Sequence, residues 1–327
     1  MTNGEDKFTV HAGLDEAGYG PMLGPLTVGF SAFRRTGPVD WSSLSGAVSD
    51  APGKDGQRLV VADSKRVFTR NPRGAKRLET TALTFLRAAG SDGATPDDLF
   101  ASAPRALRPI ADVQSTHPWY GALPAALPVH ADAETLAARA ALLTGTLVET
   151  RTEVAAAGVV VVPAGSLNAS FAATDNKGAT LWSYHSRVIL ELFERFGEEG
   201  LDLTCDRLGG RARYGRSLSA LIPFSTVHVV SESRSDSHYL VTAGERRMGI
   251  RFVQKGDVRS LPTALGSCLA KYARELVMDA FNEHFRGLCP QVRPTAGYVS
   301  DARRWLAEVE QARPEALPSR TCLVRSR

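Results

Sequence analysis

The most restrictive feature of this sequence is a pair of adjacent carboxylates, Asp15 and Glu16, followed by a dense run of glycines and prolines. An alternating apolar pattern leads up to the pair: Phe8, Val10, Ala12 and Leu14. The alternation predicts a half-buried β-strand, and the glycines and prolines of residues 18–25 predict that regular structure stops there. Because neighbouring strand residues point to opposite faces, we expect the two carboxylates to reach one site only if the strand ends at them.

The glycines after the acidic pair also suggest a ligand. Dense glycine lets a backbone approach a bound molecule closely and exposes its N–H groups. Carboxylates beside exposed amides suit a divalent metal ion and a phosphate that are bound together. The alternative is an acidic pair in a solvated turn after a strand, without a function.

The composition limits the class of protein. Of the 327 residues, 43% are hydrophobic and 23% are charged, so the chain can bury a globular core in one large or two small domains. We find no apolar run long enough to cross a membrane and no visible signal peptide. Four scattered cysteines predict reduced thiols and a cytoplasmic location. A net charge of +4 permits a nucleic-acid partner if the charge is clustered.

The order of the predicted elements indicates an α/β protein with a mixed central sheet flanked by helices. We expect a second strand at residues 26–33, antiparallel to the first, and further strands at residues 158–163, 201–206, 225–231, 238–242 and 248–254. Apolar residues at helical spacing predict helices at residues 72–89, 176–197, 264–285 and 301–312. Residues 90–150, rich in Ala and Pro, are expected to form a partly helical insertion, anchored by the buried aromatic turn of residues 117–120.

Two further carboxylates stand where a site could form. Asp206 closes a predicted strand, and Glu275 shares a helix face with Ser267 and Lys271. Functional groups gather at the carboxyl ends of strands in α/β sheets, so Asp206 could lie beside the acidic pair. The alternatives are a strand-end residue that faces a loop, and an ordinary exposed ion pair between Lys271 and Glu275.

Such a set of carboxylates predicts a particular chemistry. Carboxylates brought together resist ionisation unless cations neutralise them. Oxygen ligands without His or Cys favour Mg²⁺ or Mn²⁺, and two such ions clamp the attacking water and the leaving oxygen of a phosphodiester. Four arginines within residues 207–216, with Lys65 and Lys255, could bind phosphates, unless they form only a solvated basic loop.

Several motifs, in this order along the chain, resemble those of the type-2 ribonucleases H, the bacterial HII/HIII group. The first is Asp15-Glu16-Ala17-Gly18-x-Gly20-Pro21-x-x-Gly24-Pro25. The others are Asp63-Ser64-Lys65, the strand-ending Asp206, Lys255-Gly256-Asp257, the helix segment from Ala264 to Glu275, and Gly297-Tyr298. The resemblance covers residues 8–86 and 158–312 and leaves out the insertion.

This resemblance implies a ribonuclease H-like fold over residues 8–312, interrupted by the 90–150 insertion, with a C-terminal helical segment and a tail at residues 313–327. It implies a hydrolase that cuts the RNA strand of RNA–DNA hybrids, leaving a 5′-phosphate and a 3′-hydroxyl. Members of the HII type also cut at ribonucleotides embedded in duplex DNA, and whether this chain does so stays open. By the same resemblance, four acids would hold two metal ions: Asp15, Glu16, Asp206 and Glu275. Substrate contacts would come from Gly18, Tyr19, Gly20, Ser64, Lys65, Lys271 and Tyr298. The backbone of residues 18–20 would read the ribose 2′-hydroxyl, and Tyr298 would stack on the following sugar.

The chain departs from the family pattern in three places. Position 19 is Tyr rather than the Arg or Thr usual there, the fourth acid is Glu275 as in the HIII type, and the insertion is foreign to the family. Two alternatives stay open: a non-catalytic nucleic-acid-binding protein of the same fold, and a nuclease for another phosphodiester substrate. The four acids favour an enzyme, because a pure binder gains nothing from negative charge beside phosphates.

Overall fold

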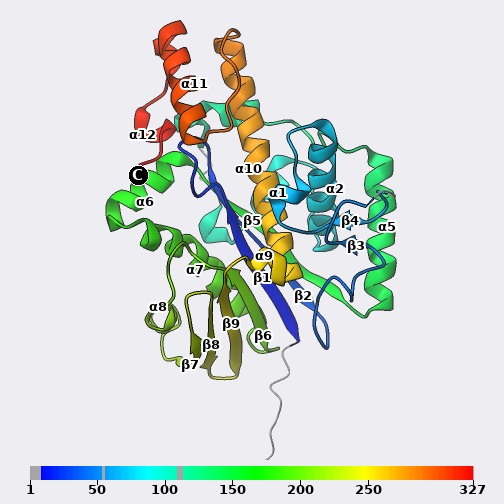
Figure 1. The fold of residues 1–327 in the computed structure, drawn as a ribbon. Helices are drawn as coiled ribbons and strands as arrows, with labels where there is room; N and C mark the ends of the chain where they lie inside the picture. Colours follow the sequence, from blue (N-terminus) through cyan, green and yellow to red (C-terminus); the bar gives the residue numbers. More distant parts are fainter. Residues whose placement is uncertain (1–8, 54–55, 109–112, 327) are drawn as a thin grey trace, which may run out of the picture.

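The fold is built around a seven-stranded sheet with helices on both faces (Figure 1). The computed structural model describes residues 9–53, 56–108 and 113–326. The strands of the sheet are β1 (Val10–Ala17), β2 (Leu26–Arg34), β5 (Glu153–Val162), β6 (Leu201–Asp206), β7 (Thr226–Glu232), β8 (Asp236–Ala243) and β9 (Arg246–Val253). They lie in the order β5-β2-β1-β6-β9-β8-β7, with β1, β6 and β9 parallel and the other neighbours antiparallel. The predicted α/β fold with a mixed central sheet is confirmed.

Helices cover both faces of the sheet. They are α1 (Ser64–Val67), α2 (Pro72–Ala88), α3 (Pro96–Ala101), α4 (Val113–Thr116), α5 (Ala133–Glu149), α6 (Ala164–Thr174), α7 (Lys177–Phe196), α8 (Gly215–Leu221), α9 (Gly256–Arg259), α10 (Leu261–Leu288), α11 (Val299–Ala312) and α12 (Arg320–Leu323). Alternate residues of β5 belong to different cores: Val159 and Val161 pack with α10, whereas Val160 and Val162 pack with α7. These two helices therefore lie on opposite faces. The central strand β1 is buried on both, which corrects the prediction of a half-buried strand.

The long helix α10 approaches the sheet closely because glycines face it. A Cβ atom on Gly13 would lie 2.0 Å from the backbone N of Thr263, and one on Gly29 would lie 2.0 Å from the carbonyl O of Gly266. Gly266 itself has no room for a side chain, since its Cβ would lie 2.8 Å from the carbonyl O of Gly29. These contacts fix the height of α10 above β1 and β2.

The acidic pair lies inside a strand rather than after it. β1 runs through Asp15 and Glu16 to Ala17 and keeps its pairing with β2 there. The expectation that the strand ends at the pair is wrong, because the ladder to β2 continues up to the start of the glycine-rich loop. Phe8, the first residue of the predicted pattern, lies outside the described residues.

Other elements differ in extent from the prediction. β5 begins at Glu153 rather than at residue 158, and α10 is longer than expected at both ends. The helices α6 and α8 were not predicted. Two short strands, β3 (Val48–Ser49) and β4 (Leu59–Val60), form a separate parallel pair. The remaining predicted strands and helices are present with small shifts of their ends.

The insertion packs onto α2 and α10. Trp119 is buried, and its ring centroid lies 5.1 Å from that of Phe281 of α10, as expected for an aromatic anchor. Glu79 of α2 is completely buried and accepts hydrogen bonds from the backbone N–H groups of residues 129–131 and from the Tyr272 hydroxyl. Residues 109–112 of the insertion lie outside the described part. The domain boundaries given above stay predictions.

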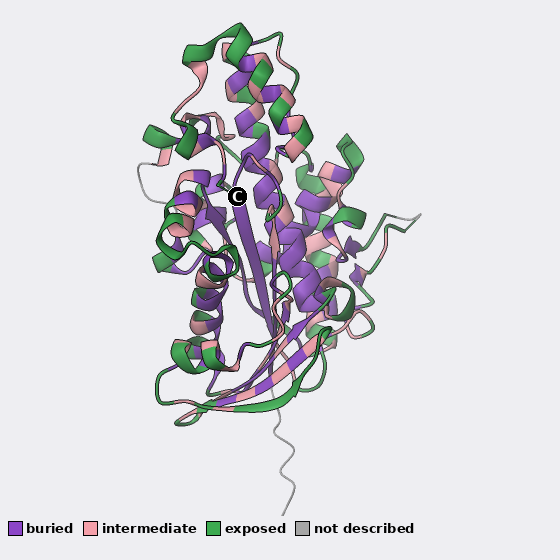
Figure 2. Ribbon diagram, turned by 60° about the vertical axis from the view of Figure 1, so that its left-hand side comes forward, coloured by how far each residue is buried: buried purple, intermediate pink, exposed green. Residues whose placement is uncertain are grey.

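Burial divides the sheet into a protected centre and an exposed edge. Figure 2 shows most of the sheet and the inner face of α10 buried, whereas the edge strand β7 has no buried residue. Of the described helices, none combines the length and apolar character needed to cross a membrane.

Candidate active site

Asp15 and Asp206 lie side by side on adjacent parallel strands. The register pairs Leu14 of β1 with Cys205 of β6, so the residues that follow each of them are neighbours. Asp15 shares its face of the sheet with Gly13, and therefore points toward α10. Oδ1 of Asp206 accepts a hydrogen bond of 2.8 Å from the backbone N–H of Gly256, at the start of α9. The structure thus brings these two predicted acids together at the carboxyl ends of the strands.

The two carboxyl groups are enclosed and repel each other. Asp15 is only 7% exposed, and its Oδ1 accepts a hydrogen bond of 2.7 Å from the backbone N–H of Glu16. The nearby Ser267 hydroxyl of α10 acts to lower its pKa. Burial, together with the charges of Glu16 and Asp206, raises the pKa of Asp15 well above its usual value. Burial, together with the charges of Glu16 and Asp257, raises the pKa of Asp206 to about 6. Without a cation, both carboxyl groups therefore keep their protons to a higher pH than isolated carboxyl groups do.

Glu16 points toward the opposite face and meets a histidine of α7. Its Oε2 lies 3.3 Å from Nε2 of His185, whose side chain is completely buried. Among the described residues, Oε2 of Glu16 and both ring nitrogens of His185 are buried without a hydrogen-bond partner. His185 was not predicted as a site residue. Its place on the apolar stripe, four residues after Leu181, was a signal of burial but not of a contact with β1.

Asp257 of α9 is a further acid at this edge, quoted above only as part of a motif. Its charge contributes to the raised pKa of Asp15 and of Asp206. Its own pKa is raised by burial and by the nearby charge of Asp63. The acidic region is therefore larger than the predicted set. The available signal was the position of Asp257 within the motif Lys255-Gly256-Asp257.

Glu275 is placed differently from the three acids of the strands. Its Oε1 accepts hydrogen bonds from Nζ of Lys271 at 2.5 Å and from Nη1 of Arg274 at 3.3 Å. The Lys271 and Glu275 side chains are 13% and 15% exposed, so the alternative of an exposed ion pair is wrong. The Lys271 ammonium also lies 4.8 Å from the ring centroid of Phe68. Glu275 is thus neutralised by cations of its own helix.

Three of the predicted substrate-binding residues border one surface hollow. Lys65 of α1, Lys271 of α10 and Tyr298 line a hollow of about 520 Å³. Two ammonium groups and an exposed aromatic ring suit a phosphate and a sugar or base. Ser64, the residue before Lys65, is buried at the start of α1.

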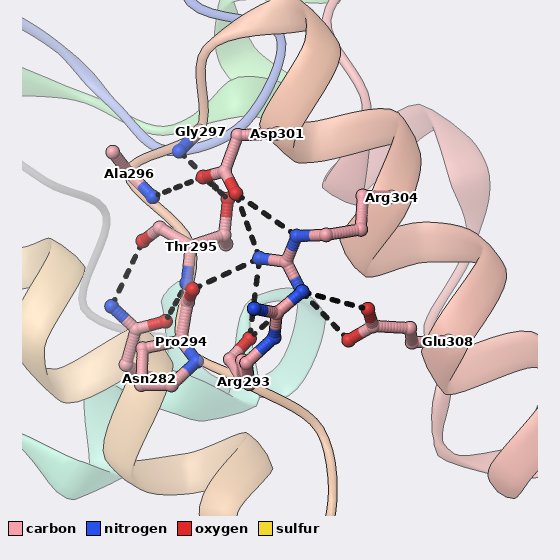
Figure 3. A network of polar contacts seen from close by, with 9 residues as sticks. All are labelled: Asn282, Arg293, Pro294, Thr295, Ala296, Gly297, Asp301, Arg304 and Glu308. Atoms are coloured by element: carbon pink, nitrogen blue, oxygen red, sulfur yellow. Dashed lines mark hydrogen bonds and ion pairs between the residues drawn. The ribbon is translucent and has the colours of Figure 1, made fainter.

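A polar network holds the loop that carries Tyr298 (Figure 3). Asp301 of α11 accepts hydrogen bonds from the Thr295 hydroxyl at 2.7 Å and from the Ala296 N–H at 2.8 Å. Its other oxygen accepts one of 2.7 Å from Arg304, which also donates to the carbonyl O of Pro294. The residues before Tyr298 are therefore tied to the first turns of α11, which follow it.

The glycine-rich loop presents the other predicted substrate contacts. Gly18 has a φ of +85°, and a Cβ there would lie 2.6 Å from the carbonyl O of Pro25, so only glycine fits. Tyr19 is 44% exposed and, with Gly20, borders a second hollow of about 350 Å³ that also reaches Phe171 and Lys177. Of the predicted contacts, Lys65, Lys271 and Tyr298 thus border one hollow and Tyr19 and Gly20 another, whereas Gly18 and Ser64 line neither.

The basic stretch at residues 207–216 is only partly solvated. The Arg211 guanidinium lies 5.0 Å from the ring centroid of Trp182 and 4.8 Å from that of Tyr214. Arg207 donates a hydrogen bond to the carbonyl O of Arg234. Arg213 is highly exposed although its Nε lies 3.6 Å from the Glu232 carboxylate, and Arg216 is also exposed, so part of the stretch is open to solvent.

The donors at the strand ends suit a hard divalent cation. Asp15, Glu16 and Asp206 offer only oxygen ligands, and the buried Oε2 of Glu16 lacks a hydrogen-bond partner in the described part of the chain. Within residues 9–53, 56–108 and 113–326, no three His, Cys, Asp or Glu side chains are already arranged as the ligands of one ion. The chemistry of the donors therefore fits Mg²⁺ or Mn²⁺, and ligation would require their side chains to turn toward a shared point.

The sequence matches no protein-family model and no curated protein. Solved structures with a similar course of the chain include a chain of the PCNA:RNase HII complex from Archaeoglobus fulgidus (17% identity, 97% of this chain and 92% of the other, TM-score 0.42). They also include ribonuclease H2 from Pyrococcus horikoshii OT3 (13% identity, 95% and 93%, TM-score 0.36). A third is Bst-RNase HIII in complex with Mn²⁺ (14% identity, 98% and 67%, TM-score 0.43). These three solved structures are thus ribonucleases of the HII, H2 and HIII types, and the chain is similar to them at low identity.

Proposed function

We propose that this protein is a metal-dependent nuclease that hydrolyses the RNA strand of RNA–DNA hybrids. The observation that carries the proposal is the pair Asp15 and Asp206 at adjacent strand ends, each with a raised pKa because of burial and its acidic neighbours. Such a cluster gains most from divalent cations. The resemblance of the sequence motifs to those of type-2 ribonucleases H supports the hybrid as substrate.

Within this proposal, Asp15 and Asp206 would hold the ions. Glu16 would join them after its side chain turns away from His185, and Glu275 after it exchanges Lys271 for a cation. When bound by these acids, Mg²⁺ or Mn²⁺ would supply Lewis acidity and would activate the attacking water. The Gly256 amide fixes the orientation of the Asp206 carboxylate, and the Ser267 hydroxyl lies near the Asp15 carboxylate. These two contacts come from α10 and α9, so both helices help to preorganise the acids.

The remaining contacts would hold the substrate. Lys65 and Lys271 bind backbone phosphates, while the backbone of residues 18–20 and the Tyr298 ring contact the ribose. In the reaction, water adds to phosphorus and the P–O3′ bond breaks. The 3′-oxygen leaves as a hydroxyl after taking up a proton, and the 5′-phosphate remains on the other fragment.

A second candidate function is binding of nucleic acid without cleavage. It is favoured by the ion pairs of Glu275 with Lys271 and Arg274, and by the lack of a ready three-ligand arrangement among the described residues. In a binder, Glu275 would keep its cations when nucleic acid is present.

A cleavage panel tests the proposal. Wild-type protein is incubated with RNA–DNA hybrid, duplex DNA with one ribonucleotide, duplex DNA or duplex RNA, with Mg²⁺ or Mn²⁺. We expect cleavage of the hybrid, a loss of about 10³-fold or more in Asp15→Asn, and little change in Asp202→Asn, an acid earlier on β6 that faces Arg251. Equal rates in wild type and Asp15→Asn would sink the assignment, and hybrid binding without cleavage would favour the second candidate.

A further inference from the structure

The last residues of the described chain are bound to the glycine-rich loop. Arg325 donates hydrogen bonds from Nε to the carbonyl O of Gly24 at 2.8 Å and from Nη1 to the carbonyl O atoms of Gly18 and, at 3.4 Å, Pro21. Its backbone N–H donates to the carbonyl O of Met22 at 3.0 Å. One side chain thus joins three points of the loop that follows the acidic pair.

Arg325 is buried in an unusual way for a cation. It is 5% exposed, and no carboxylate in the described part of the chain lies within salt-bridge distance of it. Its charge is stabilised by the loop carbonyls, and burial together with the charge of Arg274 lowers its pKa to about 9. Movement of any of the three carbonyls would leave a buried charge with fewer partners, so the contact favours one loop conformation.

The segment that carries Arg325 is itself anchored. Asn168 of α6 donates hydrogen bonds to the carbonyl O atoms of Thr321 and Val324, and its Oδ1 accepts one from the backbone N–H of Ser326. Leu323 is buried in the core that contains α10. The C-terminal end is therefore a fixed support rather than a loose tail.

The glycine-rich loop is also held by the segment that leads into Tyr298. The carbonyl O of Gly297 accepts hydrogen bonds from the backbone N–H groups of Met22 at 2.7 Å and Leu23 at 3.1 Å. Arg274, which contacts Glu275, fills the space in which a Cβ of Gly18 would stand. The loop that Arg325 binds thus connects the acidic pair with the segment that leads into Tyr298.

We propose that Arg325 is a positioning residue that fixes residues 18–24 from the C-terminal segment, residues 320–326, through the three loop carbonyls. The inference deepens the proposed function and rests on it for its catalytic consequence. Residues 18–20 would present their backbone to the ribose only while this support is in place. The C-terminal segment is then part of the substrate-reading apparatus through its support of this loop.

The test compares Arg325→Met with Arg320→Met, in which an exposed arginine of the same segment is changed. Hydrogen–deuterium exchange of peptides covering residues 18–25 and residues 72–88 is measured in the metal-free full-length proteins. We expect exchange in the first peptide to rise about ten-fold or more in Arg325→Met only, with the α2 peptide unchanged. Loop exchange within about two-fold of wild type in folded Arg325→Met would overturn the proposal.

Single-turnover cleavage of hybrid provides the second readout. We expect Arg325→Met to lose about 10- to 100-fold in rate while its Mn²⁺ affinity stays within about three-fold, since the acids are intact. If wild type does not cleave hybrid, the proposed function fails, whereas the exchange experiment still decides the role of Arg325. If Arg325→Met does not fold by circular dichroism, Arg325→Lys is used in its place: its single ammonium cannot reach all three carbonyls, so unchanged loop exchange would overturn the proposal in the same way.

Discussion

The acids of the strands and the acid of the long helix differ in what surrounds them. Asp15 and Asp206 face other carboxylates, and burial and repulsion raise the pKa of both. Glu275 instead accepts hydrogen bonds from Lys271 and Arg274. The strand acids therefore gain from an added cation, whereas Glu275 would have to give up cations that it already has.

The two regions are also positioned by different means. The register of β1 with β6 places Asp15 beside Asp206 through main-chain hydrogen bonds alone. The position of Glu275 depends on how closely α10 approaches the sheet, which the glycines facing it permit. Substitutions of the strand acids should therefore affect cleavage without affecting the fold. Substitutions of the glycines that face α10 should affect both.

The largest effect is expected from Asp206→Asn. Loss of this carboxylate should reduce single-turnover cleavage of hybrid by about 10³-fold or more, or about 4 kcal/mol, since it removes negative charge from the cation site and keeps the shape of the side chain. Hybrid affinity, measured by fluorescence anisotropy, should stay within about three-fold. If Asp206→Asn cleaves as fast as wild type and as Asp202→Asn, the strand acids are not the reactive centre.

Next in size is the effect of Gly29→Ala on stability. The new Cβ would lie 2.0 Å from the carbonyl O of Gly266, so α10 must move away from β2 at a cost of about 3 kcal/mol in the free energy of unfolding. The control is Gly287→Ala in α10, where a Cβ would have open space around it. Its free energy of unfolding should stay within about 1 kcal/mol of the wild-type value. Urea unfolding measures both, and equal stability of the two variants would contradict close packing as the basis of the position of α10.

A smaller loss of activity is expected from Glu275→Gln. Because Glu275 is already paired with two cations, its removal should reduce cleavage by about 10- to 100-fold, less than the loss of Asp206. Glu283→Gln, at an exposed ion pair of the same helix, is the control and should cleave at the wild-type rate. A loss as large as that of Asp206→Asn would show that Glu275 belongs with the strand acids despite its pairing.

The smallest effect concerns pH in the absence of metal. The pKa of Asp206 is about 6 in the folded protein against an ordinary 3.8, so the folded state binds more protons between these values. Its contribution to stability therefore decreases as pH rises through this window. At pH about 7 in EDTA, Asp206→Asn should be more stable than wild type by about 1 kcal/mol, and the difference should vanish near pH about 4. A wild type that is the more stable protein at neutral pH would contradict the repulsion within the cluster.

Much of this arrangement could be predicted from the sequence. Apolar alternation and glycine placement predicted the antiparallel pair of strands that carries Asp15 and Glu16, and a polar residue after an apolar strand marked Asp206. These signals are local, because strand ends and helix faces are determined by neighbouring residues. The extent of β1 was misjudged because its pairing with β2 depends on residues outside the motif.

What could not be predicted depends on packing between distant parts of the chain. His185 contacts Glu16 because α7 packs on the face of the sheet to which Glu16 points. Arg325 binds the carbonyl O of Gly18 although the two residues are more than three hundred positions apart in the sequence. His185 stands on the apolar stripe of its helix, but that position does not indicate which strand it meets, and Arg325 belongs to no motif. Lys271 and Glu275 have the spacing of an ordinary helical ion pair, and only the tertiary fold shows that they are enclosed.

Direct titration with Mn²⁺ tests the central claim, that the strand acids form a divalent cation site. Binding is followed by calorimetry on wild type, Asp15→Asn and Asp202→Asn at neutral pH, with and without bound hybrid. We predict saturable binding by wild type and Asp202→Asn, and binding at least about ten-fold weaker in Asp15→Asn. The absence of saturable binding by wild type under both conditions, or equal binding by wild type and Asp15→Asn, would contradict the account.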